Sequence, residues 1–557
     1  MTPKLYCRLG IVLLTVLACP VFLSAEQPAV GALERYVSAP DPAYKWEVVS
    51  QSAADGMNHV VLDMTSQSWL SADQVDRTTW RHWIVIAYPD NVDFETGFLM
   101  IGGGSNGGQV PTRPDKQLRQ LAQATGSVVA EVKMIPNQPL VFHDDGQPRF
   151  EDDLIGYTWD QFLQTGEKMW LARNAMVKAS VRAMDAVSEF MASAAGGQRK
   201  VEKFVVAGAS KRGWTTWLTA AVDSRVVGFV PIVIDVVNVD PSMRHHFAAY
   251  GFWAPAVGNY VQHGIMQRMA DPRTAELYQV VDPVIYLERL TMPKLILNAA
   301  GDQFFLPDSS QFYWDKLKQP KQIRYVPNAD HSMRETDALE TLVAFYSLVQ
   351  RQQKFPDFRW TLSADAIEVV AKDRPVELRL WQATNPEARD FRVETLGAKF
   401  TSTLLQTDES GTYRINLTEP KQGWTAYFVE ALYDVGTATP LKLTSGVKVI
   451  PEVLPFADKD PSKPPTLTVV AATNDDATEE KIVAAIELLK SLRKFPKPET
   501  VKVKVHQGRC YVNWEGDLNK LHAEAGALAK FLQEQGCESV HFQIESGDQI
   551  TMPPGGQ

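Results

Sequence analysis

An α/β fold built on a mostly parallel sheet is predicted by the alternation of apolar strand-like runs and helical stretches between residues 58 and 350. Three apolar runs, at 204–207, 226–237 and 294–300, have the composition of buried strands. The run at 226–237 is nearly continuous, which is typical of a central parallel strand covered on both faces. Shorter runs between 58 and 101 suit antiparallel strands that open such a sheet.

The most informative feature of this predicted sheet is a sharp turn at Ser210. The sequence Gly208-Ala209-Ser210-Lys211-Arg212-Gly213 follows the strand at 204–207 and precedes a helical stretch at 214–221. A serine between a buried strand and a helix is the nucleophile elbow of α/β-hydrolases, and small neighbours leave room for the tight turn. The second glycine comes one position later than in G-x-S-x-G, a spacing similar to that of the glucuronoyl-esterase branch. An ordinary strand–turn–helix with a buried serine is the alternative interpretation.

An aspartate and a histidine follow two later predicted strands. Asp302 follows the strand at 294–300, and His331 follows the strand at 322–326. The order Ser, Asp, His is the one that α/β-hydrolases use. A serine hydroxyl becomes nucleophilic when a histidine takes its proton, and a carboxylate fixes the tautomer of that histidine. We therefore predict a triad of Ser210, Asp302 and His331, with Asp235, at the end of the run 226–237, as the alternative acid.

A glycine-rich loop follows the predicted strand at 97–101. Its sequence is Gly102-Gly103-Gly104-Ser105-Asn106-Gly107-Gly108, and it lacks the G-x-x-x-x-G-K-[ST] pattern of a phosphate loop. This is the usual place for the second oxyanion donor of the fold. We therefore predict that the backbone N–H groups of Lys211, Gly103 and Gly104 form the oxyanion hole. The alternative is a flexible turn without a role in binding.

A long insertion at about 240–290 carries aromatic and histidine residues, of which His246, Tyr250 and Trp253 are candidates for the substrate pocket. The insertion is either a lid or wall of the substrate cleft, or a helical cap that packs on the sheet. Because the adjacent His245 and His246 point in different directions on a helix, a metal pair is not favoured. We expect no metal and no cofactor.

The N-terminus has the pattern of a secretory signal peptide, which we assign to residues 1–25. Lys4 and Arg8 precede an apolar run at 9–23, and Ser24-Ala25 ends it. We expect an exported protein, periplasmic or extracellular, with no transmembrane segment after cleavage. A lipid anchor at Cys19 is the alternative. The net charge of −10 argues against a nucleic-acid partner.

The composition changes near residue 356, where the helical pattern of the predicted hydrolase domain (26–355) stops. Short alternating strands at 356–457 predict an immunoglobulin-like β-sandwich, which either braces the hydrolase domain or binds carbohydrate. Residues 463–550 have the βαββαβ order of a ferredoxin-like domain, without the C-x₂-C series of an iron–sulfur site. Signal cleavage leaves two of the four cysteines, Cys510 and Cys537, which we predict to form a disulfide.

Five motifs together resemble the PhoPQ-activated pathogenicity-related family, over roughly residues 30–450. They are Asp153-Leu154-Ile155-Gly156-Tyr157-Thr158-Trp159, Gly208-Ala209-Ser210-Lys211-Arg212-Gly213-Trp214, His245-His246-Phe247-Ala248-Ala249-Tyr250-Gly251, Asn298-Ala299-Ala300-Gly301-Asp302-Gln303-Phe304-Phe305 and Asp330-His331-Ser332. The resemblance implies an exported α/β-hydrolase-like protein, linked in bacteria to a magnesium- and acid-sensing regulatory system. It implies no substrate. The chain departs from the family pattern at Gly251-Phe252-Trp253, near the predicted pocket.

These observations predict an exported serine hydrolase of the esterase or peptidase type. Its substrate would be a small molecule, a peptide or a carbohydrate ester. Two alternatives remain open at this point. One is a binding protein that keeps the fold without activity, and the other is an esterase specific for carbohydrates.

Overall fold

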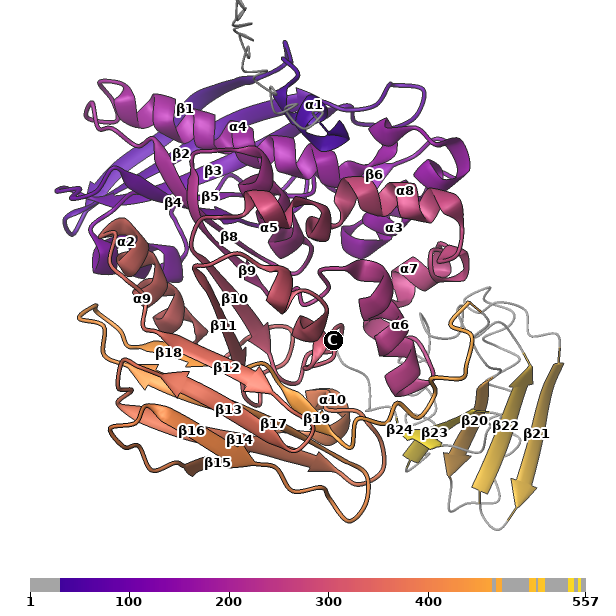
Figure 1. Ribbon diagram of the computed structural model, residues 1–557. Helices are drawn as coiled ribbons and strands as arrows, with labels where there is room; N and C mark the ends of the chain where they lie inside the picture. Colours follow the sequence, from indigo (N-terminus) through magenta and orange to yellow (C-terminus); the bar gives the residue numbers. More distant parts are fainter. Residues whose placement is uncertain are drawn as a thin grey trace, which may run out of the picture.

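The computed structural model describes residues 31–462 and five strands between 467 and 551. The predicted signal peptide and Cys19 lie outside the described residues, so cleavage and lipid anchoring stay predictions. A nine-stranded sheet runs through the first domain in the order β1-β2-β3-β5-β4-β8-β9-β10-β11 (Figure 1). The strands are β1 (Lys45–Ala54), β2 (Met57–Ser68), β3 (Thr79–Pro89), β4 (Thr96–Ile101), β5 (Val129–Val132), β8 (Lys203–Ala209), β9 (Val226–Ile232), β10 (Lys294–Ala299) and β11 (Lys321–Val326).

The pairing of these strands is that of an α/β-hydrolase. β1, β2 and β3 are antiparallel, and β3 also pairs antiparallel with β5. From β5 onward, every neighbouring pair is parallel. Parallel strands end at the same edge of the sheet, so the loops after β4, β8, β10 and β11 meet there. The prediction of an α/β-hydrolase fold for the first domain is confirmed.

Helices cover both faces of the sheet because the strand residues are apolar on both sides. In β8, Phe204 and Val206 belong to one buried cluster, and Val205 and Ala207 to the other. The first cluster packs on α4 (Ala172–Ala192) and α5 (Lys211–Val222), and the second on α2 (Lys116–Thr125) and α9 (Ala338–Gln350). The remaining helices of this domain are α1 (Ala32–Ser38), α3 (Glu151–Thr165), α6 (Val239–Tyr250), α7 (Gly258–Gln262) and α8 (Pro272–Val281). None of the helices in the described ranges is long and apolar enough to cross a membrane.

Local sequence explains where the two helices next to the site begin and end. The Asp115 side chain caps α2 by accepting a hydrogen bond from the Gln117 amide, and Gly126 ends that helix in the left-handed conformation. α3 starts with three acidic residues, which suit the positive end of the helix dipole. Short elements complete the domain: β6 (Leu140–Val141), β7 (Pro148–Arg149) and the 3₁₀ helices Lys168–Trp170, Pro255–Val257, Met266–Arg268, Pro283–Arg289, Ser309–Phe312 and Trp314–Lys316.

Two antiparallel sheets follow the hydrolase domain, as predicted for residues 356–457. One contains β12 (Phe358–Leu362), β13 (Ala366–Ala371) and β16 (Thr412–Asn416). The other contains β14 (Glu377–Asn385), β15 (Thr401–Leu404), β17 (Trp424–Tyr433), β18 (Leu441–Thr444) and β19 (Lys448–Ile450), and the helix α10 (Val393–Leu396) lies between β14 and β15 in sequence. Their buried residues share one hydrophobic cluster with α9, so this region packs on the hydrolase domain (Figure 1). Its immunoglobulin-like class stays a prediction.

The last five strands form an antiparallel sheet in the order β21-β22-β20-β23-β24. They are β20 (Leu467–Ala472), β21 (Thr500–His506), β22 (Arg509–Glu515), β23 (Ser539–Ile544) and β24 (Gln549–Thr551). β22 lies between β20 and β21, which is the split arrangement that the predicted motif requires. The two predicted helices of this motif and Cys537 lie outside the described residues. The ferredoxin-like assignment and the disulfide with Cys510 therefore stay predictions.

Candidate active site

Ser210 lies at the turn from β8 into α5, with backbone angles φ 58° and ψ −128°. This conformation costs a residue other than glycine about 1–3 kcal/mol, and such strain is found at nucleophile elbows. The two glycines of the motif explain how the turn closes. A Cβ on Gly208 would meet the carbonyl oxygen of Arg212 at 2.7 Å, and one on Gly213 would meet the carbonyl oxygen of Gly208 at 2.8 Å. The later position of the second glycine is thus required by the contact between α5 and β8.

His331 and Asp302 are hydrogen-bonded to each other in the loops after β11 and β10. The distance from His331 Nδ1 to Asp302 Oδ2 is 2.8 Å. The other carboxylate oxygen, Oδ1, accepts hydrogen bonds from the amides of Phe304 at 2.7 Å and Phe305 at 3.3 Å. A carboxylate at this position accepts the Nδ1–H of the histidine, and in a neutral imidazole with that tautomer Nε2 carries the lone pair. This is the tautomer that a general base needs.

The Nε2 atom of His331 is buried and has no hydrogen-bond partner among the described residues. The backbone amide of His331 donates a hydrogen bond to Gln303 Oε1 at 2.8 Å. The imidazole ring packs against the Phe304 ring, 4.2 Å from centre to centre. The Ser210 hydroxyl is not hydrogen-bonded to Nε2 in this structure. Such bonds are often long in enzymes without substrate and tighten when substrate binds.

Asp235, the alternative acid, is hydrogen-bonded to two tyrosines and not to His331. β9 ends at Ile232 and β10 at Ala299, so Asp235 and Asp302 each lie three residues past a strand. Both carboxylate oxygens accept hydrogen bonds from tyrosine hydroxyls, those of Tyr313 and Tyr325, each at 2.6 Å. Burial raises the pKa of Asp235 to about 7. The structure joins Asp302, and not Asp235, to His331.

The predicted oxyanion donors are one amide of the elbow and two amides of the glycine loop. The amide of Lys211 is the first of α5, where a helix has no internal acceptor for it. The N–H groups of Gly103 and Gly104 donate no hydrogen bond within the part of the chain that the structure describes. Gly104 has φ 128°, and a Cβ on Gly103 would meet Arg212 Nη2 at 2.8 Å. The missing side chain at Gly103 thus lets the loop lie against Arg212, two residues after the predicted nucleophile.

Two cations after Ser210 are held by two acids at the start of α3. Lys211 Nζ lies 2.8 Å from Glu151 and 3.0 Å from Asp152, and Arg212 Nη2 lies 2.6 Å from Glu151. Burial opposes ionisation of Glu151, but the two cations hold its pKa at about 2. This cluster of two cations and two acids is not predicted from the sequence. Its signal is the acidic triplet at 151–153, which the sequence analysis did not place at the start of a helix.

Comparison with known proteins identifies the family. The family model of the PhoPQ-activated pathogenicity-related proteins matches residues 33–392. The chain belongs to this family. It is also 38% identical over 455 residues to the autocrine proliferation repressor protein A of Dictyostelium discoideum, an alignment that covers 76% of this chain and 91% of that protein.

Solved structures with similar folds are far more distant. An acetyl xylan esterase from Thermoanaerobacterium is 16% identical, with a TM-score of 0.39, covering 57% of this chain and 92% of that one. A glucuronoyl esterase from Solibacter usitatus is 13% identical, with a TM-score of 0.33, covering 56% of this chain and 87% of that one. Similarity at this level says nothing about what the present chain acts on.

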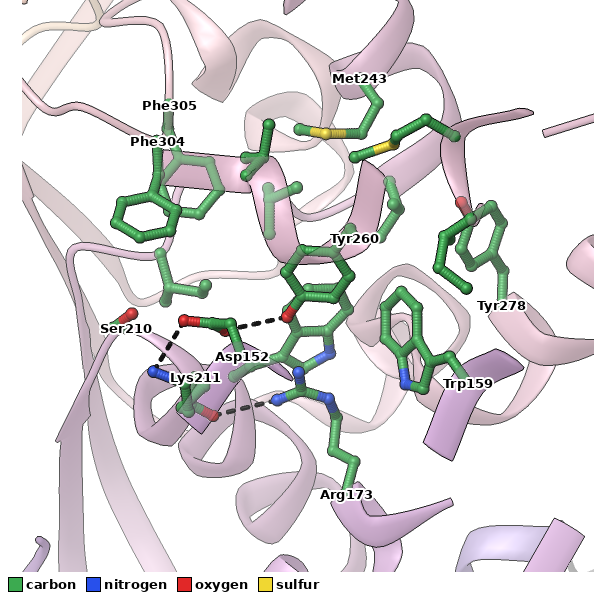
Figure 2. Close-up of a pocket in the computed structure, with 17 residues that line it drawn as sticks. Asp152, Trp159, Arg173, Ser210, Lys211, Met243, Tyr260, Tyr278, Phe304 and Phe305 are labelled. Atoms are coloured by element: carbon green, nitrogen blue, oxygen red, sulfur yellow. Dashed lines mark hydrogen bonds and ion pairs between the residues drawn. The ribbon is translucent and has the colours of Figure 1, made fainter. Parts of the chain in front are cut away.

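A small cavity opens beside Ser210 and has a volume of about 50 Å³ (Figure 2). Its walls are aromatic and aliphatic, and one end is polar. At that end Tyr260 donates a hydrogen bond to Asp152 at 3.0 Å, and the fully buried Arg173 donates to the carbonyl oxygen of Lys211 at 3.0 Å. The Arg173 guanidinium also stacks on the Trp214 ring, 4.2 Å from its centre.

A second cavity of about 620 Å³ lies on the other side of the elbow, between α2 and α9. Ala209, which precedes the nucleophile, and Ser332, which follows the histidine, both line it. Polar and charged residues contribute to its lining, among them Asp115 and Lys133. The elbow therefore separates a small apolar cavity from a large, partly polar one.

The predicted pocket residues His246, Tyr250 and Trp253 are not among the residues that line the cavity at Ser210, so their part in a substrate pocket stays a prediction. The His246 ring contacts both aromatic rings: it meets Tyr250 edge to face at 4.8 Å and stacks on Trp253 at 5.6 Å, centre to centre. The Trp253 indole donates to the carbonyl oxygen of Pro461 at 3.3 Å. The end of α6 thus faces the segment after residue 457. Met243 of α6, Tyr260 of α7 and Tyr278 of α8 contribute to the wall of the cavity at Ser210.

No group of three or more histidine, cysteine or acidic side chains that could hold a metal ion exists within the described residues.

Proposed function

We propose that this protein is an exported serine hydrolase that cleaves carboxylic esters with Ser210, His331 and Asp302. The observation that carries the proposal is the 2.8 Å bond between His331 Nδ1 and Asp302, which leaves the buried Nε2 without a partner among the described residues. The strained backbone angles of Ser210 at the turn after β8 support it. A buried histidine with only one polar partner is poorly satisfied unless its second nitrogen has a chemical use. Export rests on the signal sequence alone.

The reaction would run through an acyl-enzyme. Ser210 Oγ attacks the ester carbonyl carbon while His331 Nε2 takes the hydroxyl proton. The oxyanion accepts hydrogen bonds from the Lys211 amide and from the glycine loop at 102–104. Collapse breaks the bond to the leaving oxygen, which receives the proton from Nε2. A water molecule, activated by His331, then attacks the acyl group, and Ser210 is released with its proton restored.

The size of the cavity at Ser210 favours esters over peptides. A peptide substrate carries a side chain and a continuing main chain on the acyl side of the scissile bond. The enclosed part of the cavity, about 50 Å³, is small for both. An ester of a simple acid needs only the space for its acyl group. The carbohydrate-ester alternative is one case within this proposal.

Labelling with a fluorophosphonate probe tests the proposal. We expect the probe to modify Ser210 in the exported protein, and labelling to vanish in Ser210→Ala and fall strongly in His331→Ala. Ser105→Ala is the matched control, because Ser105 is an exposed serine in the neighbouring glycine loop. Unchanged labelling in Ser210→Ala would overturn the assignment of the nucleophile.

A second candidate is a binding protein that has kept the fold without activity. The name of the Dictyostelium relative describes an effect on proliferation and not a reaction. The same experiment separates the two. A folded protein in which Ser210 is never labelled would favour the binding function.

A further inference from the structure

We infer that the two-sheet domain (356–457) positions the proposed catalytic pair, because its segment 389–400 holds the loops that carry Asp302 and His331. This inference rests on the proposed function, and it gives the second domain a part in the reaction. The segment lies between β14 and β15 in sequence and includes α10, on the side of this domain that faces the hydrolase domain (Figure 1). It touches the two loops at three points.

The first contact is at Gly301, the residue before the proposed catalytic acid. Its carbonyl oxygen accepts a hydrogen bond from the Val393 amide at 3.0 Å. A Cβ on Gly301 would collide with Val393 Cγ2, so the missing side chain lets the two segments lie in contact. The Gly301 amide donates to the carbonyl oxygen of Ala329, in the loop of His331, at 3.0 Å. Gly301 therefore joins both loops to the second domain.

The second contact is at Asn328, three residues before His331. Its Nδ2 donates to the carbonyl oxygen of Phe400 at 2.9 Å, and the Phe400 amide donates to its Oδ1 at 2.8 Å. Because both polar groups of one side chain are paired with the backbone of one residue, direction and distance are both fixed. The Phe400 ring is buried and packs against Phe428 of β17, 5.5 Å from centre to centre. The partner of Asn328 thus belongs to the core of the second domain.

The third contact is at Asp308, six residues after Asp302. Its Oδ2 accepts a hydrogen bond from Arg389 Nη2 at 2.6 Å, and Nε2 of His245 in α6 lies 3.1 Å from both carboxylate oxygens. Asp308 and Arg389 are both buried, and loss of one partner from a buried ion pair is strongly destabilising. This ion pair therefore fastens the two domains together, and the first two contacts are better suited to a test of position.

The proposed acid and base depend on such contacts because they come from different loops. Asp302 follows β10 and His331 follows β11, so the 2.8 Å bond between them requires both loops to be correctly placed. A displacement of about 1 Å, caused by a change far from the chemistry, can lower a rate by about 10²-fold. Since one segment of the second domain is bonded to both loops, it sets their relative position. Asn328 is therefore a positioning residue.

The variant Asn328→Gly tests this role. Asn328 has φ 57°, which glycine adopts without strain, so the substitution removes the two hydrogen bonds to Phe400 and allows the same backbone angle. Glu335→Gly is the matched control. Glu335 also has φ 57°, lies on the other side of His331 in the same loop, and is exposed.

We expect kcat/KM for nitrophenyl acetate to fall by about tenfold or more in Asn328→Gly and to stay within about twofold in Glu335→Gly. Introduced into Asp302→Asn, Asn328→Gly should cost less than about twofold, because the bond that it positions is already lost. A loss of folded protein would lower the rate by the same factor in both backgrounds. The dependence on Asp302 therefore separates position from stability, and the Tm of each variant is measured alongside.

Val393→Pro tests the contact at Gly301, and it replaces Asn328→Gly if that variant does not fold. Proline has no amide hydrogen for the Gly301 carbonyl oxygen, and it suits the first position of α10. Arg392, which precedes it, already has the extended angles that a residue before proline adopts, φ −57° and ψ 136°. We expect the same dependence on Asp302.

The outcomes distinguish this inference from the proposed function. Equal losses from Asn328→Gly in the wild type and in Asp302→Asn, or an equally large loss in Glu335→Gly, would overturn the inference and leave the hydrolase standing. Unchanged kinetics in both Asn328→Gly and Val393→Pro would do the same. Absence of both Ser210 labelling and hydrolysis in folded wild-type protein would remove the proposed function, and this inference with it.

Discussion

Two buried carboxylates near the carboxyl ends of neighbouring parallel strands have different environments. Asp302 and Asp235 are 4% and 3% exposed, so burial does not distinguish them. Asp302 accepts hydrogen bonds from a histidine and two backbone amides, whereas Asp235 accepts from two tyrosine hydroxyls. A position after a strand is therefore not enough to identify a catalytic acid. The hydrogen-bond donors around the carboxylate decide whether it can orient a histidine.

The largest expected effect concerns the unit to which Asp302 belongs. Ser210→Ala and His331→Ala should each lower ester turnover by about 10⁴-fold or more, and the double variant should lose little beyond either single one, because triad members act together. Steady-state kinetics on a nitrophenyl acetate gives all three values. Losses that multiply in the double variant would contradict the triad.

The second prediction tests the comparison itself. Asp302→Asn should lower turnover by about 10⁴-fold, because the amide no longer holds His331 in its basic tautomer. Asp235→Asn should leave turnover within about threefold, because Asp235 makes no contact with the histidine. Reversed results for the two variants would show that the acid has been assigned to the wrong strand.

The third prediction concerns stability. The pKa of Asp235 is about 7 in the folded chain, above its ordinary value of 3.8. The folded state therefore binds this proton more tightly than the unfolded state. The stabilisation is complete below pH 3.8 and is lost as pH rises toward 7, by an amount on the order of a few kcal/mol.

Asp235→Asn removes this titration, so we expect its Tm to vary less than that of the wild type between pH 4 and pH 8. The control is Asp458→Asn, since Asp458 is exposed. A wild-type slope that persists unchanged in Asp235→Asn would contradict the environment described for this carboxyl.

The fourth prediction concerns backbone strain at the predicted nucleophile, and its expected effect is the smallest. Because φ at Ser210 is 58°, glycine should be more stable there than alanine by about 1 kcal/mol. At Ser188, inside helix α4, the same pair of substitutions should differ by a similar amount in the opposite sense. Denaturant unfolding of the four variants measures both differences. Alanine at Ser210 as stable as glycine would argue against a strained elbow.

The same two carboxylates show which features of the site can be predicted from the sequence. The sequence predicts Ser210, Asp302 and His331 because each follows a predicted strand within a few residues, so a short local pattern places it near the same edge of the sheet. Asp235 was ranked second, but its tyrosine partners could not be foreseen, because Tyr313 and Tyr325 reach it from distant segments.

The residues of the cap show where sequence patterns are least informative. His246, Tyr250 and Trp253 belong to a stretch that is apolar on most sides, and no periodicity told which side would face the site. The acids at 151–152 and Arg173 were missed because α3 and α4 meet the elbow only through tertiary packing. Their available signals were an acidic triplet at a helix start and a buried arginine within an apolar helix.

The acyl-enzyme offers the most direct test of the central claim. Rapid mixing with nitrophenyl acetate, acid quenching and peptide mass spectrometry would locate any transferred acetyl group. The account predicts one acetyl group on the peptide that carries Ser210 in the wild type, and none there in His331→Ala on the same timescale. Ester hydrolysis with the acetyl group on another residue, or with no modification of Ser210, would contradict it.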